Sequence, residues 1–247
     1  MNEAMRMWAE VGFNVLYLLG IYWLVVLMVR RLGDVAQAQR PLARLIIWAF
    51  ALLALGDTGH VGFRVWAYAL GGLEASIPIF GADVGLVGLG ALATSITVTL
   101  FYGLMVFIWR ERFNKALGWA GWLLLATAVV RFGIMLFPQN EWQNVVPPQP
   151  WSLYRNLPLM VQGLGVAYLI LRDARAAGDR TFLWIGVMIL TSYAFYMPVI
   201  FLVQRVPLVG MLMIPKTLAY VAIAAIAYQR LFRRTGETAV VGLSSAG

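Results

Sequence analysis

The chain has 247 residues, of which 62% are apolar and 12% charged, and its 19 basic residues outnumber its 11 acidic ones. Soluble domains are about half apolar and about a quarter charged, so this composition excludes a water-soluble globular protein, a disordered chain and a collagen-like chain. The absence of cysteine and the single histidine exclude disulfides, thiolate metal sites and multi-histidine metal sites. We therefore expect neither a bound metal nor zinc-dependent hydrolysis.

Seven long apolar segments predict an all-α, polytopic membrane protein built as a seven-helix bundle. At 1.5 Å per residue each segment can cross about 30 Å of hydrocarbon, and the continuous run at 122–126 lacks the alternation of a β-barrel strand. One domain over 1–234 should precede a disordered cytoplasmic tail over 235–247. The spans are expected at about 9–29, 45–66, 84–109, 116–137, 152–171, 182–203 and 206–231.

The distribution of basic residues predicts the orientation of the bundle. Thirteen of the 19 lie in four stretches, at 30–44, 110–115, 172–180 and 230–234. Cytoplasmic loops retain lysine and arginine, so the N-terminus should be outside and the C-terminus cytoplasmic. We expect a multi-pass protein of a bacterial inner membrane. Because topology accounts for the positive charge, no nucleic-acid partner is expected.

Ionisable residues in the second and seventh segments need an explanation, because each costs about 2.5–3.5 kcal/mol near the middle of a bilayer. His60 and Arg64 follow Asp57 by three and seven residues, which places all three on one stripe of a helix. Lys216 lies at a depth similar to that of Asp57, so the two could meet across the bundle. The stripe is either a ligand-binding site or a structural clasp in which His60 or Arg64 neutralises Asp57.

Other polar residues of the spans map to the same extracytoplasmic half, and the cations among them outnumber the carboxylates. Buried cations need an anion to offset their desolvation. We therefore expect a pocket open to the extracytoplasmic side that binds a small anionic or amphiphilic ligand, in a receptor or a transporter surrounded by membrane lipids. A separate membrane partner would carry any signal. The expected ligand-binding residues are Asp57, His60, Arg64, Arg131, Arg155, Gln162, Tyr196 and Lys216.

The last two segments offer a second interpretation, in which the chain resembles the microbial rhodopsins. The sixth is aromatic and contains a proline, and a lysine follows at mid-depth in the seventh; these are Tyr193, Phe195, Tyr196, Pro198 and Lys216. The resemblance implies a retinal cofactor bound to Lys216 as a Schiff base. The sequence departs from the pattern at Leu212, where those proteins usually carry an acidic or small polar residue. Without retinal, no cofactor is expected.

Two further alternatives remain open. In size and helix count the chain is similar to membrane-bound terpene cyclases, which implies an enzyme acting on a lipid or isoprenoid. Asp57 would then be the general acid and His60 its partner. In the other alternative the protein is a non-catalytic scaffold or accessory subunit, and its interior charges are purely structural.

Overall fold

The computed structural model describes residues 3–79 and 82–233, and it is helical apart from one short hairpin. Strands β1 (Ser76–Ile79) and β2 (Ala82–Gly85) pair in antiparallel register, with Ser76 opposite Gly85. The expected tail at 235–247 lies outside the described residues. The helices are α1 (Glu3–Arg31), α2 (Arg40–Ala69), α3 (Leu86–Phe113), α4 (Gly118–Met135), α5 (Trp151–Ala176), α6 (Arg180–Leu202) and α7 (Met213–Ala227).

Seven helical segments in the described ranges are long and apolar enough to cross a membrane. The prediction of seven helices of spanning length is therefore confirmed, while membrane insertion and orientation stay predictions. Large apolar side chains face outward on these helices: Leu16 is 72% exposed and Val129 71%. A bilayer would cover such a surface, which water does not favour.

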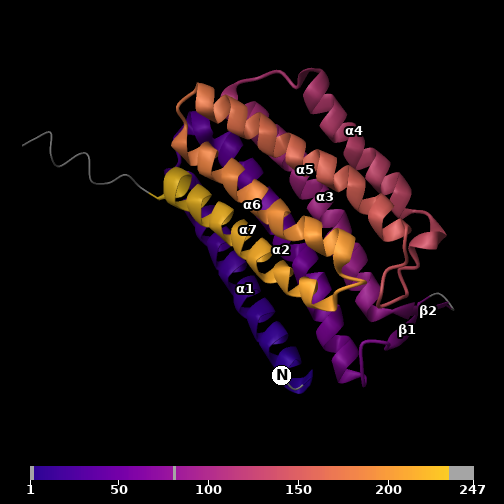
Figure 1. Ribbon diagram of the computed structural model, residues 1–247. Coiled ribbons are helices and arrows are strands. Elements are labelled where there is room, and N and C mark those ends of the chain that lie inside the picture. The colour runs from indigo at the N-terminus through magenta and orange to yellow at the C-terminus, as the bar shows by residue number, and fades with distance from the viewer. Residues whose placement is uncertain (1–2, 80–81, 234–247) are drawn as a thin grey trace, which may run out of the picture.

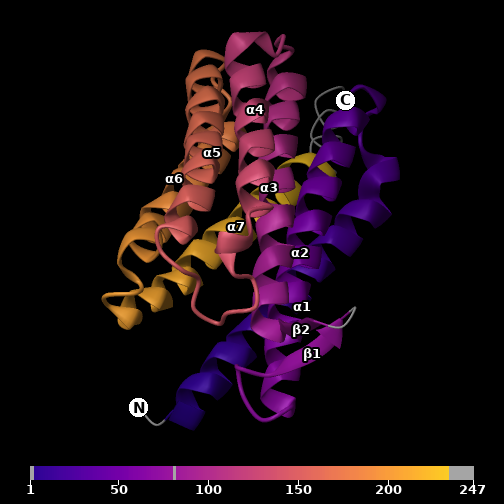
Figure 2. The ribbon, with the colours of Figure 1, turned by 90° about the vertical axis from the view of Figure 1, so that its right-hand side faces the viewer.

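The helices form a closed ring with one member outside it. Packed neighbours follow the order α1, α2, α3, α5, α6 and α7, and α7 returns to contact α1. Helix α4 packs on the outside against α5 and α3 (Figure 1, Figure 2). The interior of the bundle is thus lined by six helices, and α4 reaches it with one edge.

The two ends of the bundle differ in structure. The N-terminus, the β1–β2 hairpin and the α4–α5 and α6–α7 connections lie at one end, which we call the hairpin end (Figure 2). The connections α1–α2, α3–α4 and α5–α6 lie at the other, which we call the basic end because most arginines are there. At the basic end Asp179 caps α6 by accepting hydrogen bonds from the backbone N–H groups of Thr181 and Phe182.

Several helices run past the spans expected from the sequence, among them α1, α2 and α5, and α7 begins later than expected. Helix α5 continues past residue 171 to Ala176, and in this last part Asp173 is buried and accepts hydrogen bonds from Trp109 and Arg172. A 3-10 segment (Pro207–Leu212) precedes α7, which begins at Met213. Pro215 therefore sits in the first turn, where a missing N–H costs no helical hydrogen bond, and it does not kink the helix in its middle.

Glycines allow two close approaches that shape the bundle. A Cβ on Gly56 would lie 1.7 Å from Oγ1 of Thr97, so only glycine lets α2 pack this tightly on α3. A Cβ on Gly88 would lie 1.2 Å from the carbonyl oxygen of Trp142. The α4–α5 connection (136–150) therefore folds down onto the start of α3 and covers part of the hairpin end.

Candidate functional site

Asp57 is held between three helices near the hairpin end. Oδ2 accepts a hydrogen bond from the hydroxyl of Tyr17 on α1 at 2.5 Å, and Oδ1 accepts one from Oγ1 of Thr94 on α3 at 2.9 Å. Both carboxylate oxygens are thus engaged by neutral donors. These bonds fix the direction in which Asp57 points and tie α1 and α3 to α2.

His60 and Arg64 follow Asp57 along α2 and are half-buried. The backbone of His60 packs against Gly90 of α3, where an added Cβ would lie 2.9 Å from the Cα of His60. This part of the predicted stripe therefore lies where α2 crosses α3.

Arg131 joins three helices in the bundle interior and is only 2% exposed. Its Nε donates to the carbonyl oxygen of Arg155 on α5 at 2.8 Å. Its Nη1 donates to the carbonyl oxygen of Ser95 at 3.0 Å and to the hydroxyl of Thr99, both on α3. The hydrogen-bond partners of Arg131 are therefore neutral groups. These bonds hold the outer helix α4 against α3 and α5.

Arg155 lies beneath the α4–α5 connection and is 7% exposed. Its guanidinium is 4.3 Å from the ring centroid of Trp142, and its Nη1 donates to Oδ1 of Asn140 at 3.4 Å. An aromatic face attracts a cation by electrostatics, more strongly where water is excluded. The groups that contact the Arg155 guanidinium are therefore also neutral.

Lys216, in the first turn of α7, sits on two tyrosine rings. Its Nζ lies 4.5 Å from the ring centroid of Tyr196 and 5.5 Å from that of Tyr220. Tyr196 in turn donates its hydroxyl proton to Oδ1 of Asn156 on α5 at 3.2 Å. The charges of Asp57 and Arg131 both act on Lys216.

A layer of tyrosines lies next to Lys216 on the side of the bundle centre. The hydroxyls of Tyr102 on α3 and Tyr220 on α7 are 2.8 Å apart. Tyr193 on α6 donates to the carbonyl oxygen of Leu159 at 2.8 Å, and its ring lies 5.6 Å from that of Tyr102. All three are nearly inaccessible to solvent, so these hydroxyls form a polar layer deep in the ring of helices.

Gln162 is fully buried on α5, and neither its side-chain nitrogen nor its oxygen has a hydrogen-bond partner in the described part of the chain. Its Nε2 faces Gly103, where an added Cβ would lie at 4.0 Å. Gly103 is one helical turn beyond Thr99, a partner of Arg131. Gln162 thus lies beside the Arg131 contacts and one turn deeper.

The structure gathers part of the predicted set and adds residues that sequence reasoning missed. Arg131 bonds to the backbone of Arg155, and Lys216 lies on the ring of Tyr196, whose hydroxyl bonds to Asn156, the next residue along α5. Gln162 lies beside the Arg131 contacts, and the charge of Asp57 acts on Lys216. Within the described chain no ion pair joins Asp57 to any of the three cations. The residues in these contacts that the predicted set left out are Tyr17, Thr94, Thr99, Tyr102, Asn140, Trp142, Asn156 and Tyr220.

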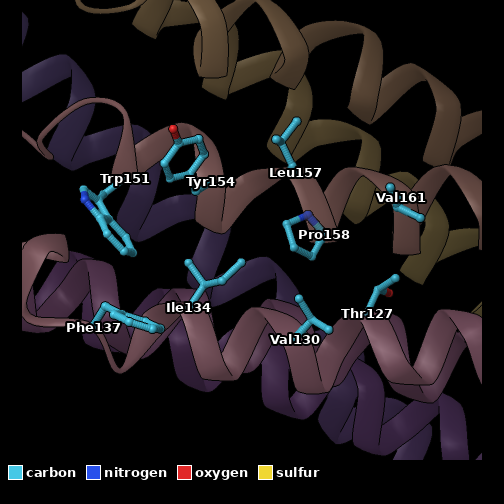
Figure 3. Close-up of a pocket in the computed structure, with 9 residues that line it drawn as sticks. All are labelled: Thr127, Val130, Ile134, Phe137, Trp151, Tyr154, Leu157, Pro158 and Val161. Atoms are coloured by element: carbon cyan, nitrogen blue, oxygen red, sulfur yellow. The ribbon is translucent and has the colours of Figure 1, made fainter.

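A groove of about 600 Å³ lies on the outside of the bundle between α4 and α5. Val130, Ile134 and Pro158 face one another along it, with Phe137 and Trp151 at one end (Figure 3). It is open, and its lining is apolar apart from one threonine and one tyrosine. None of the eight predicted ligand-binding residues lines it.

No protein-family model, curated protein or solved structure matches this chain. Its function is therefore inferred from its own residues and their chemistry.

The interior cluster has the chemistry of an anion site with an amphipathic lining. It combines two guanidinium groups and one ammonium group with tyrosine hydroxyls and one amide that has no partner. The described residues hold no group of three or more histidine, aspartate or glutamate side chains placed to bind a metal.

Proposed function

We propose that this chain is a multi-pass membrane protein that binds a small anionic or amphiphilic ligand inside the bundle, towards the hairpin end. One observation carries the proposal: among the described residues, Arg131, Arg155 and Lys216 form no ion pair, and their contacts are with carbonyls, an amide, a hydroxyl and aromatic faces. A buried charge without an ionic partner is costly. A bound anion would offset that cost for all three at once.

The ion pairs elsewhere in the described chain strengthen this contrast. Arg112 pairs with Asp179 at 2.7 Å and Arg172 with Asp173 at 2.9 Å, both at the basic end. There the fold supplies each of these two arginines with a carboxylate. In the interior, Asp57 is instead oriented by Tyr17 and Thr94. The positive charge of the interior is thus available to a ligand.

The orientation predicted from the basic residues would place this site in the extracytoplasmic half of the membrane. A receptor or a transporter that takes its ligand from that side would use such a site. Its tyrosines, Tyr196 and Tyr220, offer ring faces as well as hydroxyls. They would suit a ligand with both an anionic head and an apolar body.

The test uses purified protein in mild detergent and three single-chain probes that differ only in the head group: hexadecyl phosphate, hexadecanol and hexadecyltrimethylammonium. We expect hexadecyl phosphate to raise the thermal unfolding temperature clearly more than either of the other two probes. Equal stabilisation by all three would contradict the proposal. Mass spectrometry of what co-purifies with the protein would then identify the natural ligand.

The two lysines of the chain provide a matched pair of variants. Lys216→Gln should lose most of the stabilisation by hexadecyl phosphate, whereas Lys115→Gln, which changes an exposed residue at the basic end, should keep it. Lys216→Arg retains the charge and should retain the response, provided that size-exclusion chromatography shows a folded protein. A full response in Lys216→Gln would remove Lys216 from the site.

The Lys216→Gln variant also distinguishes the retinal interpretation from this proposal. Adding retinal to the purified protein should leave it colourless if Lys216 serves as a cation for an anionic ligand. A visible absorption band that disappears in Lys216→Gln would replace the proposal with a photoreceptor. The enzyme and scaffold alternatives stay predictions.

A further inference from the structure

The groove between α4 and α5 has the length of one leaflet of a bilayer. Its lining runs from Thr127 on α4 to Phe137, two residues past the end of that helix, and from Trp151 to Val161 on α5. Ten residues of helix rise about 15 Å, which is half of the roughly 30 Å hydrocarbon core. Phe137 and Trp151, with ring centroids 5.2 Å apart, lie at the end next to the α4–α5 connection, as aromatic residues do at a membrane interface.

The side chains that line the groove suit an uncharged chain. No charged residue lines it, and the side chains of Val130 and Val161 are about half exposed there. The hydroxyl of Thr127 already donates to the carbonyl oxygen of Leu124 at 2.7 Å. The hydroxyl of Tyr154 points away from α4 (Figure 3). A lipid chain can therefore lie in the groove without leaving a side-chain polar group unsatisfied.

Pro158 gives the groove one acceptor of hydrogen bonds. Proline has no N–H, so Pro158 inside α5 cannot bond to the carbonyl oxygen four residues earlier, which belongs to Tyr154. Tyr154 and Pro158 both line the groove. In a bilayer a backbone carbonyl needs a donor from a neighbouring group, and Tyr154 lies about one turn from the aromatic end. The acceptor is thus placed just below the level of lipid head groups.

We propose that this groove binds one chain of a membrane amphiphile whose head group is an uncharged hydroxyl, and that the hydroxyl donates to the carbonyl oxygen of Tyr154. The occupant is an alcohol and not an anion because the groove offers an acceptor and no cation. Neither Arg131 nor Arg155 lines the groove. This second site rests on insertion into a membrane and is independent of the interior anion site.

The test places the protein in phosphatidylcholine nanodiscs with a hexadecanol probe that carries a photoreactive diazirine in its chain. After illumination, mass spectrometry of peptides should find the label in 127–137 and 151–161. Unlabelled hexadecanol should compete about tenfold better than hexadecane, since a neutral hydrogen bond contributes up to roughly that factor. Hexadecyl phosphate should compete more weakly than hexadecanol.

Two matched pairs of variants separate shape from hydrogen bonding. Val130→Trp fills the groove and should abolish labelling, whereas Val129→Trp, at an exposed position beside it, should not. Pro158→Ala restores an N–H for the Tyr154 carbonyl and should reduce the preference for hexadecanol over hexadecane to about onefold. Pro198→Ala, which changes a helix proline outside the groove, should leave the preference at about tenfold.

Several outcomes would overturn this site. Label spread evenly over all outward helix faces would mean ordinary lipid contact. Absence of label from both segments would mean that a phospholipid chain fills the groove, and equal competition by hexadecane in the wild type would mean that the hydroxyl is not recognised. If Pro158→Ala does not fold, comparison of Val130→Trp with Val129→Trp still shows whether the probe binds in the groove. None of these outcomes alters the response of Lys216 variants to hexadecyl phosphate.

Discussion

The variant Gln162→Met tests the interior site by removing polar atoms while nearly conserving side-chain volume. Gln162 is fully buried, and both polar atoms of its amide lack a partner in the described chain. An amide buried without hydrogen bonds costs about 1–3 kcal/mol in mutational data, and a volume-conserving core substitution costs less than about 1.5 kcal/mol. The ligand-free variant should therefore gain roughly 1 kcal/mol of stability, the difference between the two.

The sign of this effect should reverse when ligand is present. A ligand at about one hundred times its Kd stabilises the protein by about 2.7 kcal/mol, and the variant should lose part of that gain because it cannot hydrogen-bond the ligand. Thermal unfolding of protein washed free of amphiphiles, with and without hexadecyl phosphate, measures both effects. Gln139→Met, at an exposed position, should change neither. A ligand-free variant less stable than the wild type would refute the reasoning, since the amide would then already be satisfied.

Three further substitutions test the contacts that hold the bundle together, each by the free energy of unfolding in mild detergent. Tyr17→Phe removes a hydrogen bond to the Asp57 carboxylate and should cost about 1.5–3 kcal/mol. Its control Tyr22→Phe removes an exposed hydroxyl contact and should cost less than about 1 kcal/mol. Equal costs would contradict the role of Asp57 in joining α1 to α2. Arg131→Gln should cost about 2–6 kcal/mol, because two carbonyls each lose a donor at about 1–3 kcal/mol, and a neutral result would show that Arg131 does not hold α4 in place. Trp109→Phe should cost about 1.5–3 kcal/mol through its lost bond to Asp173, and its control Trp119→Phe, at a residue 81% exposed, should cost nothing measurable.

The helices could be predicted from the sequence because an apolar run of sufficient length has few alternatives in a membrane. The hairpin at 76–85 could not, because strands of four residues are too short to show a clear alternation. The start of α7 at Met213, later than expected, could not be predicted from the sequence either. A 3-10 segment and an α-helix have the same apolar composition, and Pro207 and Pro215 are both acceptable in a first turn.

The polar residues of the interior could be found from the sequence, but their partners could not. Asp57 and Lys216 stand out in apolar segments, which suggests a direct pair. In the structure Asp57 contacts Tyr17 and Thr94, and Lys216 contacts Tyr196 and Tyr220. Tyrosine and threonine are common in membrane helices for structural reasons, so nothing in their spacing shows which of them faces a charge.

The α4–α5 connection covers Arg155 at the hairpin end, so we expect it to limit access to the interior. Trp142 covers the Arg155 guanidinium with its ring and packs its carbonyl against Gly88, while Gln204 donates to the carbonyl oxygen of Pro147 at 2.6 Å and joins the next connection to this one. Gly88→Ala forces the connection to move and should cost about 1–3 kcal/mol. The same displacement uncovers Arg155.

Gly88→Ala should therefore also speed the binding of hexadecyl phosphate, measured by stopped-flow tryptophan fluorescence. The control is Gly62→Ala, where an added Cβ meets nothing within 4 Å and helix stability should rise by up to about 1 kcal/mol. Its binding rate should match the wild type. If Gly88→Ala is destabilised but binds at the wild-type rate, the connection does not limit access, and the ligand reaches Arg131 and Lys216 from between the helices.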